Sequence, residues 1–220
     1  MIVGVRDLLV RQRTQAINAL RGYAAEFGVI AAKGTAQVGA LMERVRSAEA
    51  VVPEAAQEML TVLADQVAQF DGKIAGLDLK MRQAVAADET AHRLMKVPTI
   101  GPVGALTLSL TVDPAQFRSG RHFASWLGLV PKERSTGGKQ RLGGISRAGN
   151  ERLRQLLVVG AMAVIRHAKP GGKSASPWLL ALLERRPRKL AAVALANKMA
   201  RMVWAMMARG DEYRHLPVVA

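Results

Sequence analysis

The stretch from Glu54 to Met95, EAAQEMLTVLADQVAQFDGKIAGLDLKMRQAVAADETAHRLM, has apolar residues mostly at steps of three or four, with acids and bases between them. The apolar series is Met59, Leu60, Leu63, Val67, Phe70, Ile74, Leu77, Met81, Val85 and Leu94. This spacing lays one apolar stripe along a long helix and is typical of a coiled-coil or helical-hairpin arm. Gly72 and Gly76 weaken the helix and allow a bend. The alternative is an ordinary long helix packed on its own domain.

Helical patterns continue on both sides of this stretch. The expected helices are Val5 to Phe27, Leu41 to Ala50, a helix after Pro102, Arg121 to Leu129, Glu151 to His167, one from Pro177, and Leu190 to Arg209. The sequence therefore predicts a mainly α fold, in which a coiled-coil-like arm precedes a compact helical domain. We place the boundary between residues 95 and 96.

The positive charge lies in one part of the chain. Of 220 residues, 50% are hydrophobic, which is enough for a core, and the net charge is +15. Residues 1–95 hold 11 Lys and Arg against 11 Asp and Glu, whereas residues 96–220 hold 21 against 6. A neutral part joined to a basic part indicates a nucleic-acid-binding module attached to a structural one. The alternative is a soluble domain that is merely basic.

Several function classes are excluded by composition. The chain has no cysteine, so disulfides, thiol catalysis and cysteine zinc sites are excluded, and its four histidines lack metal-ligand spacing. No secretion signal is visible. The apolar run from Leu190 to Met207 contains Asn197, Lys198 and Arg201, which are costly in a membrane. These three side chains form a solvent-facing stripe or reach a ligand, and we expect a cytoplasmic protein without a membrane partner.

The segment from Pro131 to Arg154, PKERSTGGKQRLGGISRAGNERLR, has the composition of a phosphate site, formed by a short β-hairpin or a Gly-rich loop. Gly137 and Gly138 allow backbone conformations that point N–H groups at an anion. Basic side chains surround Ser135, and Asn150 is placed to cap the helix that follows. A phosphate at that helix N-terminus would also benefit from the helix dipole. The alternative is a solvated basic hairpin whose serine is inert.

A second candidate lies at Val97 to Leu108, VPTIGPVGALTL, where the charge balance changes. It is similar to a helix-hairpin-helix element, whose hairpin amides and following helix bind a backbone phosphate without reading sequence. Thr99, Gly101 and Gly104 are its candidate contacts, with Thr99 in place of the usual first glycine. A plain turn between two helices is the alternative.

Met95 to Arg214 resembles the C-terminal domain of transposases of insertion-sequence family 110, including its 1111 subgroup. The resemblance rests on three ordered segments: VPTIGPVGALTL, FRSGRHFASWLGLVPKERSTGGKQRLGGISRAGNERLR and LLERRPRKLAAVALANKMARMVWAMMARG. The N-terminal segment VRDLLVRQRTQAINALRGYAAEFGV extends it.

The resemblance implies DNA recombination through a covalent phosphoserine, with sites chosen by a structured guide RNA. It also implies an N-terminal RNase-H-like domain with an Asp-Glu-Asp-Asp magnesium site, followed by a helical arm and the serine-bearing domain. Ser135 is the implied nucleophile, and Thr136 and Ser146 are weaker candidates. The implied phosphate contacts or transition-state stabilisers are Arg134, Lys139, Arg141, Arg147, Arg152 and Arg154.

The sequence departs from the family pattern at its start. Residues 1–95 resemble the last helix of the N-terminal domain plus the arm, so we expect a truncated transposase with no metal site or cofactor of its own. Such a chain is expected to be inactive alone and incapable of full transposition unless another chain supplies the metal-binding acids, and Mg²⁺ is expected for the full-length family. The expected partners are DNA, a guide RNA and further copies bound through the arm. The alternative is a non-catalytic DNA- or RNA-binding module that modulates an intact transposase. A helical structural protein, the third possibility, would not show salt-sensitive DNA binding.

Overall fold

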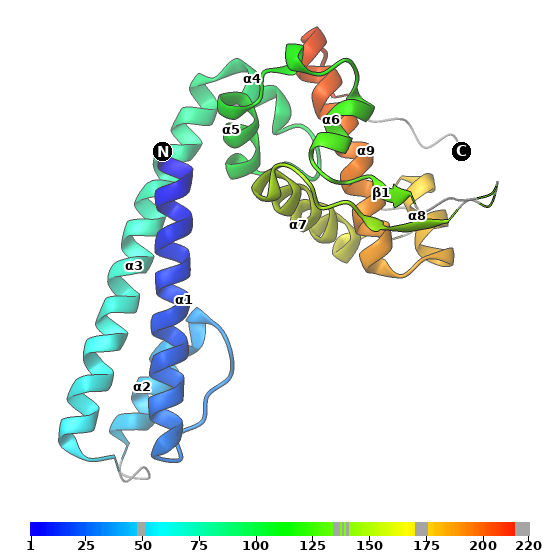
Figure 1. Cartoon of the computed structure of the whole chain (residues 1–220). Helices are drawn as coiled ribbons and strands as arrows, with labels where there is room; N and C mark the ends of the chain where they lie inside the picture. The colour runs from blue at the N-terminus through cyan, green and yellow to red at the C-terminus, as the bar shows by residue number, and fades with distance from the viewer. Residues whose placement is uncertain (48–51, 134–136, 138, 140, 170–175, 214–220) are drawn as a thin grey trace. The chain divides into compact units, whose positions relative to one another are not determined.

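The structure, a computed structural model, describes residues 1–47, 52–133, 137, 139, 141–169 and 176–213. The chain divides into two compact units, Met1–Met81 and Arg82–Ala220. Figure 1 shows that the described elements are helices apart from one pair of short strands. The predicted mainly α class is confirmed.

The first unit is built around two long helices, α1 (Ile2–Glu26) and α3 (Glu54–Ala87), with a short turn η1 (Thr35–Gln37) and the helix α2 (Val38–Arg46) between them in sequence. The long helices lie side by side and antiparallel (Figure 1). Two ion pairs join them, Arg6 to Asp78 and Arg13 to Asp71, each with a nitrogen to oxygen distance of 2.5 Å. The pairs are two helical turns apart on both helices, in opposite order, which fixes the antiparallel register.

The apolar stripe of α3 packs within its own chain. Leu60 is buried in a cluster with residues of α1 and α2, and Val67 is buried in a second cluster with Ala16 and Ile17. The helix continues through Gly72 and Gly76, where an added Cβ would meet nothing within 4 Å.

The predicted end of the long helix is wrong. α3 ends at Ala87, and a separate short helix, α4 (Glu89–Leu94), follows. Asp88 adopts an extended conformation, and its carboxylate accepts a hydrogen bond from the Ala91 N–H at 2.8 Å. Aspartate is a favoured N-cap because its side chain satisfies an N–H group that the helix leaves without a partner. The helix expected over 41–50 begins earlier, at Val38, and ends at Arg46, and residues 48–51 lie outside the described ones.

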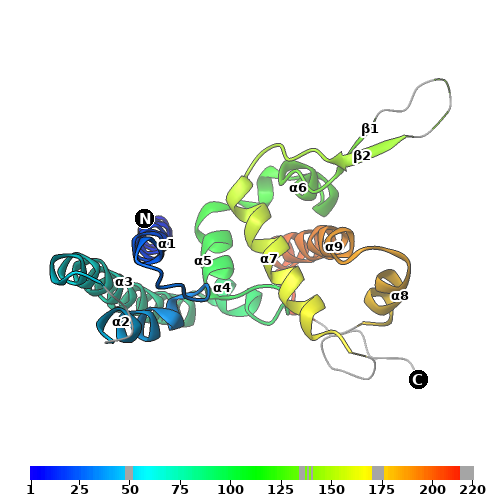
Figure 2. The ribbon, with the colours of Figure 1, turned by 90° about the horizontal axis from the view of Figure 1, so that it is seen from below.

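The second unit is formed by the helices α4, α5 (Pro102–Thr111), α6 (Gly120–Trp126), α7 (Glu151–His167), α8 (Pro177–Arg185) and α9 (Arg188–Arg209), the short turn η2 (Pro114–Gln116) and the strands β1 (Pro131–Glu133) and β2 (Leu142–Ile145). α9 lies beside α7 (Figure 2) and also packs on α6 and α8. Fully buried alanines, Ala191, Ala192, Ala196 and Ala200, let these helices approach α9 closely.

α9 is, among the helices described, the one that is long and apolar enough to cross a membrane by length and composition. In this structure 44% of its most apolar window is buried inside the protein. Since the core helix of a soluble protein passes the same test, its packing on α6 and α7 accounts for its composition. The apolar composition of this helix predicts that it is buried either in the domain core or in a contact between copies of the chain, and its packing on α6 and α7 favours the core.

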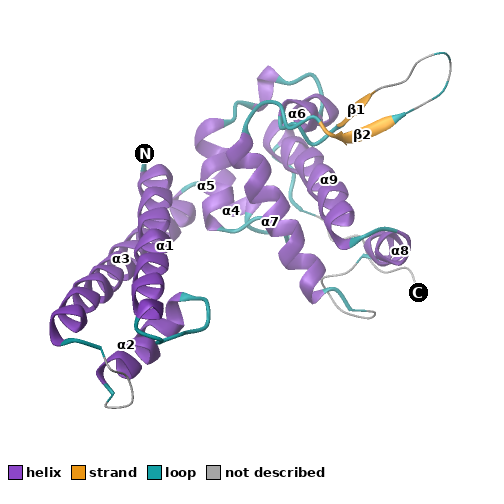
Figure 3. Cartoon of the chain, turned by 60° about the horizontal axis from the view of Figure 1, so that its bottom comes forward, coloured by secondary structure: helices purple, strands orange, loops and turns teal. Residues whose placement is uncertain are grey.

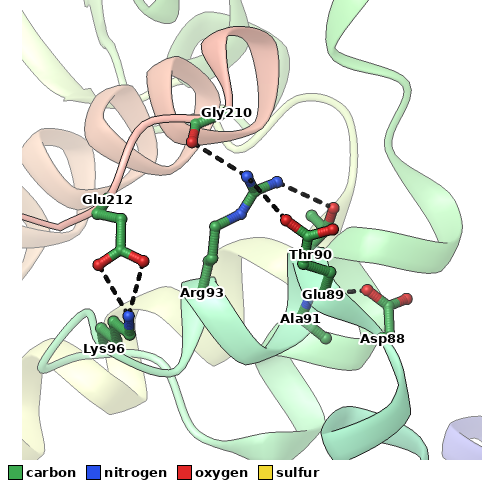
Figure 4. Close-up of polar contacts among 8 residues, drawn as sticks. All are labelled: Asp88, Glu89, Thr90, Ala91, Arg93, Lys96, Gly210 and Glu212. Carbon is green, nitrogen blue, oxygen red and sulfur yellow. Dashed lines mark hydrogen bonds and ion pairs between the residues drawn. The ribbon is translucent and has the colours of Figure 1, made fainter.

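Polar contacts fix α4 to the end of α9 (Figure 4). An Arg93 nitrogen donates to the Gly210 carbonyl at 3.0 Å, where Gly210 ends α9 with a φ of 72°. The Lys96 ammonium donates to both carboxylate oxygens of Glu212 at 2.8 Å. This ammonium holds the pKa of the Glu212 carboxyl below its ordinary value.

Candidate nucleic-acid interface

The segment expected to bind phosphate forms a β-hairpin. β1 and β2 pair antiparallel, with Pro131 opposite Ile145 and Glu133 opposite Leu142, and Figures 2 and 3 show them extending from the helices of their unit. Of the two predicted forms of this segment, a short β-hairpin and a Gly-rich loop, the hairpin is confirmed.

Only part of the hairpin tip is described. Gly137 has a φ of 58°, in the left-handed region that favours glycine. Lys139 and Arg141 are exposed. Four predicted site residues, Arg134, Ser135, Thr136 and Gly138, lie outside the described residues.

The chain returns from the hairpin to α7 through a turn that is pressed against the end of α6. Gly149 has a φ of 68°, and a Cβ there would lie 1.7 Å from the Trp126 carbonyl oxygen. Gly128 has a φ of 70°, and its Cβ would lie 2.4 Å from the Ala148 carbonyl oxygen. The Arg147 N–H donates to the Gly128 carbonyl at 3.2 Å. We call residues 126–128 and 147–149 the clasp; glycine is required at both close approaches.

Arg154 holds the clasp from inside. Its side chain is buried, with 8% of the residue exposed, and the same guanidinium nitrogen donates to the Leu127 carbonyl at 2.9 Å and to the Ala148 carbonyl at 2.8 Å. This placement corrects the expectation that Arg154 contacts phosphate. A charged donor satisfies two carbonyls that would otherwise be left without partners when the turn is buried.

The other predicted residues near the start of α7 lie nearer the surface. Arg147 is exposed and is the one described non-glycine residue with a positive φ, 57°, which costs about 1–2 kcal/mol. Arg152 is half-buried in the first turn, and Asn150 caps the helix as predicted, accepting from the Leu153 N–H at 3.0 Å. Ser146 lies in the turn, with its hydroxyl 3.5 Å from the Ala148 N–H. An anion at this corner would meet Arg147 and the positive end of the helix dipole.

Of the three predicted phosphate contacts at the turn between α4 and α5, one is exposed. The Ile100 N–H donates to the Val97 carbonyl at 2.9 Å, and Gly101 caps α5, whose first residue is Pro102. Gly101 is exposed, whereas Gly104 and Thr99 are buried, and the Thr99 hydroxyl has no hydrogen-bond partner in the part of the chain that the structure describes. Thr99 therefore packs inward.

Thr99 is buried because α7 covers it. A Cβ on Gly160 would lie 1.8 Å from the Thr99 carbonyl oxygen, so the α4–α5 turn rests on the middle of α7. The hairpin joins α7 at Asn150, about 15 Å away along the helix axis at about 1.5 Å per residue. The structure thus brings the hairpin and the clasp together and keeps the α4–α5 turn apart from them.

The described residues do not fit a metal ion. Within the ranges given above, no three His, Asp or Glu side chains lie together as ligands. None of the described residues is therefore assigned as a ligand of the magnesium expected for the full-length family, and no chemical step is assigned to it.

Comparison with known proteins identifies related sequences. Residues 91–176 match the family described as "Transposase IS116/IS110/IS902 family". The chain is 48% identical over 216 residues to the "Putative transposase y4pF/y4sB" of Sinorhizobium fredii, and this alignment covers 97% of the chain and 56% of that protein. It is 45% identical over 213 residues to the "Probable family 20 transposase" of Pseudomonas aeruginosa, covering 96% and 63%.

A third relative, the "Transposase for insertion sequence element IS1111A" of Coxiella burnetii, is 36% identical over 215 residues, with 97% of this chain and 59% of that protein covered. The chain thus spans between 56% and 63% of the lengths of these three relatives. The resemblance to insertion-sequence transposases is confirmed at the level of the family. The subgroup and the serine chemistry stay predictions.

Proposed function

We propose that the chain, which is similar over nearly its whole length to proteins named as transposases and matches the IS116/IS110/IS902 transposase family over residues 91–176, acts in DNA transposition with the Ser135 hydroxyl as the nucleophile. The observation that carries the proposal is the match over residues 91–176, because this range contains the hairpin, the clasp and the start of α7. The names of the relatives support the activity, and the exposed basic residues of the hairpin, Lys139 and Arg141, support its position.

In the proposed reaction the Ser135 oxygen attacks a backbone phosphorus. A phosphorus–oxygen bond to the serine forms, the bond to one deoxyribose oxygen breaks, and that oxygen takes a proton. Attack by a second strand's hydroxyl reverses these steps and releases the serine. Such a reaction needs cations where negative charge develops. Lys139, Arg141 and Arg147, which are exposed on the hairpin and the clasp, are the described residues suited to this.

Arg154 and the clasp glycines act as positioning residues in this proposal. Holding a nucleophile in a fixed place contributes much of the rate in reactions of this kind. Because Arg154 donates to carbonyls on both sides of the clasp, it fixes the direction in which β2 leaves the helical body. A guide RNA, self-association through α1 and α3, and action in the cytoplasm belong to the same proposal.

The proposal is tested with purified protein, Mg²⁺ and branched or element-end DNA. We expect a serine-dependent DNA adduct with strand cleavage in the wild type and none in Ser135→Ala, and strand joining where another chain supplies the metal-binding acids. Ser146→Ala is the matched control, since Ser146 lies on the same segment, and it is expected to keep the activity. Equal activity of Ser135→Ala and the wild type would contradict the nucleophile. Salt-sensitive DNA binding without cleavage in the wild type would favour a non-catalytic module.

A further inference from the structure

A groove of about 1170 Å³ runs along α9. Its walls are one face of α9, the start of α6, Trp178 of α8, and the base of the hairpin at Pro131 and residues 143–145. Among the described residues that line it, three are basic, Arg121, Lys198 and Arg201, and none is acidic. The groove therefore favours a negatively charged occupant with apolar parts.

The floor of the groove follows one helical face. Lining residues of α9 recur from Leu190 to Ala205 at steps of three or four. At about 1.5 Å per residue this face is about 22 Å long. Stacked nucleotides rise by about 3.4 Å each, so the groove is long enough for several of them.

Trp178 provides a surface for a base. It is 37% exposed although it lines the groove, and the Lys198 ammonium lies 4.3 Å from its ring centroid. An exposed indole next to a fixed cation is the pairing by which proteins hold single strands, with the ring stacking on a base and the cation meeting a phosphate.

The remaining walls suit a strand of any sequence. Leu190, Val193, Ala194 and Met202 offer only apolar contacts, and the side-chain N–H of Asn197 donates to the Leu129 carbonyl at 3.1 Å. A Cβ on Gly144 would meet nothing within 4 Å, so the hairpin wall leaves room for a backbone. Few groups here can read base edges, which is the pattern of binding by stacking and charge.

We propose that this groove binds an unpaired stretch of a DNA strand, with one base stacked on Trp178 and phosphates on Arg121, Lys198 and Arg201. The bases of a duplex are covered by their neighbours, so stacking on a side chain requires an unpaired base. The inference rests on the proposed function, because strand exchange produces unpaired DNA, and the groove's wall is the base of the hairpin that carries Ser135. It adds a binding site whose described lining contains none of the predicted phosphate contacts.

The test compares two ligands that carry the same number of phosphates. One is a single-stranded DNA, and the other is the same strand with abasic positions throughout its centre. Binding is measured with Ser135→Ala protein, so no cleavage is needed and the result is independent of the nucleophile. We expect Trp178→Leu to weaken binding of the normal strand by roughly 5- to 150-fold and to change binding of the abasic strand by less than about twofold.

Met162→Leu is the control, because Met162 is 38% exposed on α7 and is not among the described residues that line the groove. It should leave both affinities unchanged. Tryptophan emission should be quenched by the normal strand in the control and less so in Trp178→Leu, where Trp204 is the remaining tryptophan among the described lining residues, and thermal unfolding verifies that both variants fold.

Three results would overturn the inference. Equal weakening of both ligands by Trp178→Leu would mean that no base stacks there. A changed oligomeric state with unchanged strand binding would assign the groove to a second copy of the chain. Tighter binding of an RNA of the same sequence, with the same dependence on Trp178, would assign it to RNA instead.

Discussion

Gly160→Ala tests whether α7 and the α4–α5 turn meet as closely as the structure has them. In the interior of a helix, replacing glycine by alanine normally stabilises by about 0.5–1 kcal/mol, because alanine loses less backbone entropy on folding. At Gly160 the added Cβ would lie 1.8 Å from the Thr99 carbonyl oxygen and 2.8 Å from the carbonyl carbon. These are backbone atoms, so no side chain can rotate away.

The magnitude follows from the distance that must open. An ordinary carbon to oxygen contact is about 3.3 Å or more, so the turn and α7 must separate by about 1.5 Å. Forcing additional volume into a packed interior costs about 1–3 kcal/mol, which outweighs the helix-propensity gain. We expect Gly160→Ala to lower the free energy of unfolding by about 1–3 kcal/mol, the reverse of the ordinary sign.

The assay is unfolding in urea, followed by tryptophan emission. All three tryptophans, Trp126, Trp178 and Trp204, lie in the second unit, so the signal reports on the unit that contains Gly160. Gly104→Ala is the control, because its Cβ would meet only the Ile100 side chain at 3.6 Å, and it should be neutral or slightly stabilising. A Gly160→Ala protein as stable as the wild type would refute the close approach.

Two further predictions concern charged side chains. Arg154→Met should lower the free energy of unfolding by about 2–4 kcal/mol, because two buried carbonyls lose a charged donor. Arg154→Lys should not fully restore this stability. Arg166→Met is the control on the exposed part of α7, and it should change the free energy of unfolding little. The midpoints of urea unfolding measure these changes in stability. An Arg154→Met protein that keeps its stability and loses only DNA affinity would show that Arg154 contacts phosphate instead of holding the clasp. Lys96→Met should raise the pKa of Glu212 toward its ordinary value, as followed by carboxyl NMR titration, because the ammonium that lowers it is removed. The stabilisation from the Lys96–Glu212 pair is present above the ordinary pKa of the carboxyl and is lost as the pH falls through its lowered pKa. A Glu212 titration that is unchanged in Lys96→Met would contradict the contact.

Much of the fold was predictable because local chemistry decides it. Asn150 marks the start of α7, Ser176 with Pro177 that of α8, and Pro102 that of α5, since capping side chains and proline act within one helical turn. The Asp88 break was missed, although aspartate followed by Glu89 is itself a start signal. The apolar period runs on through that point, so spacing alone indicated one helix.

The candidate site was less predictable, since it depends on contacts distant in sequence. From its charge and its place in the sequence alone, Arg154 is predicted to contact phosphate. The structure shows that it donates instead to the carbonyls of Leu127 and Ala148, which lie far from it in sequence or across the turn. Gly128 and Gly149 signal only turns, and their backbone contacts appear once α6 and the returning chain are together. Trp178 and Lys198 belong to different helices, so the groove they share has no signal in sequence order.

The most direct measurement for the proposed function is mass spectrometry of a trapped protein–DNA adduct. Protein is incubated with Mg²⁺ and branched DNA, denatured and digested, and the peptide that carries a nucleotide is sequenced. We predict one modified peptide, with the phosphodiester on Ser135, present in Ser146→Ala and absent from Ser135→Ala. An adduct on Ser146 or Thr136, or strand transfer that proceeds without any adduct on this chain, would contradict it.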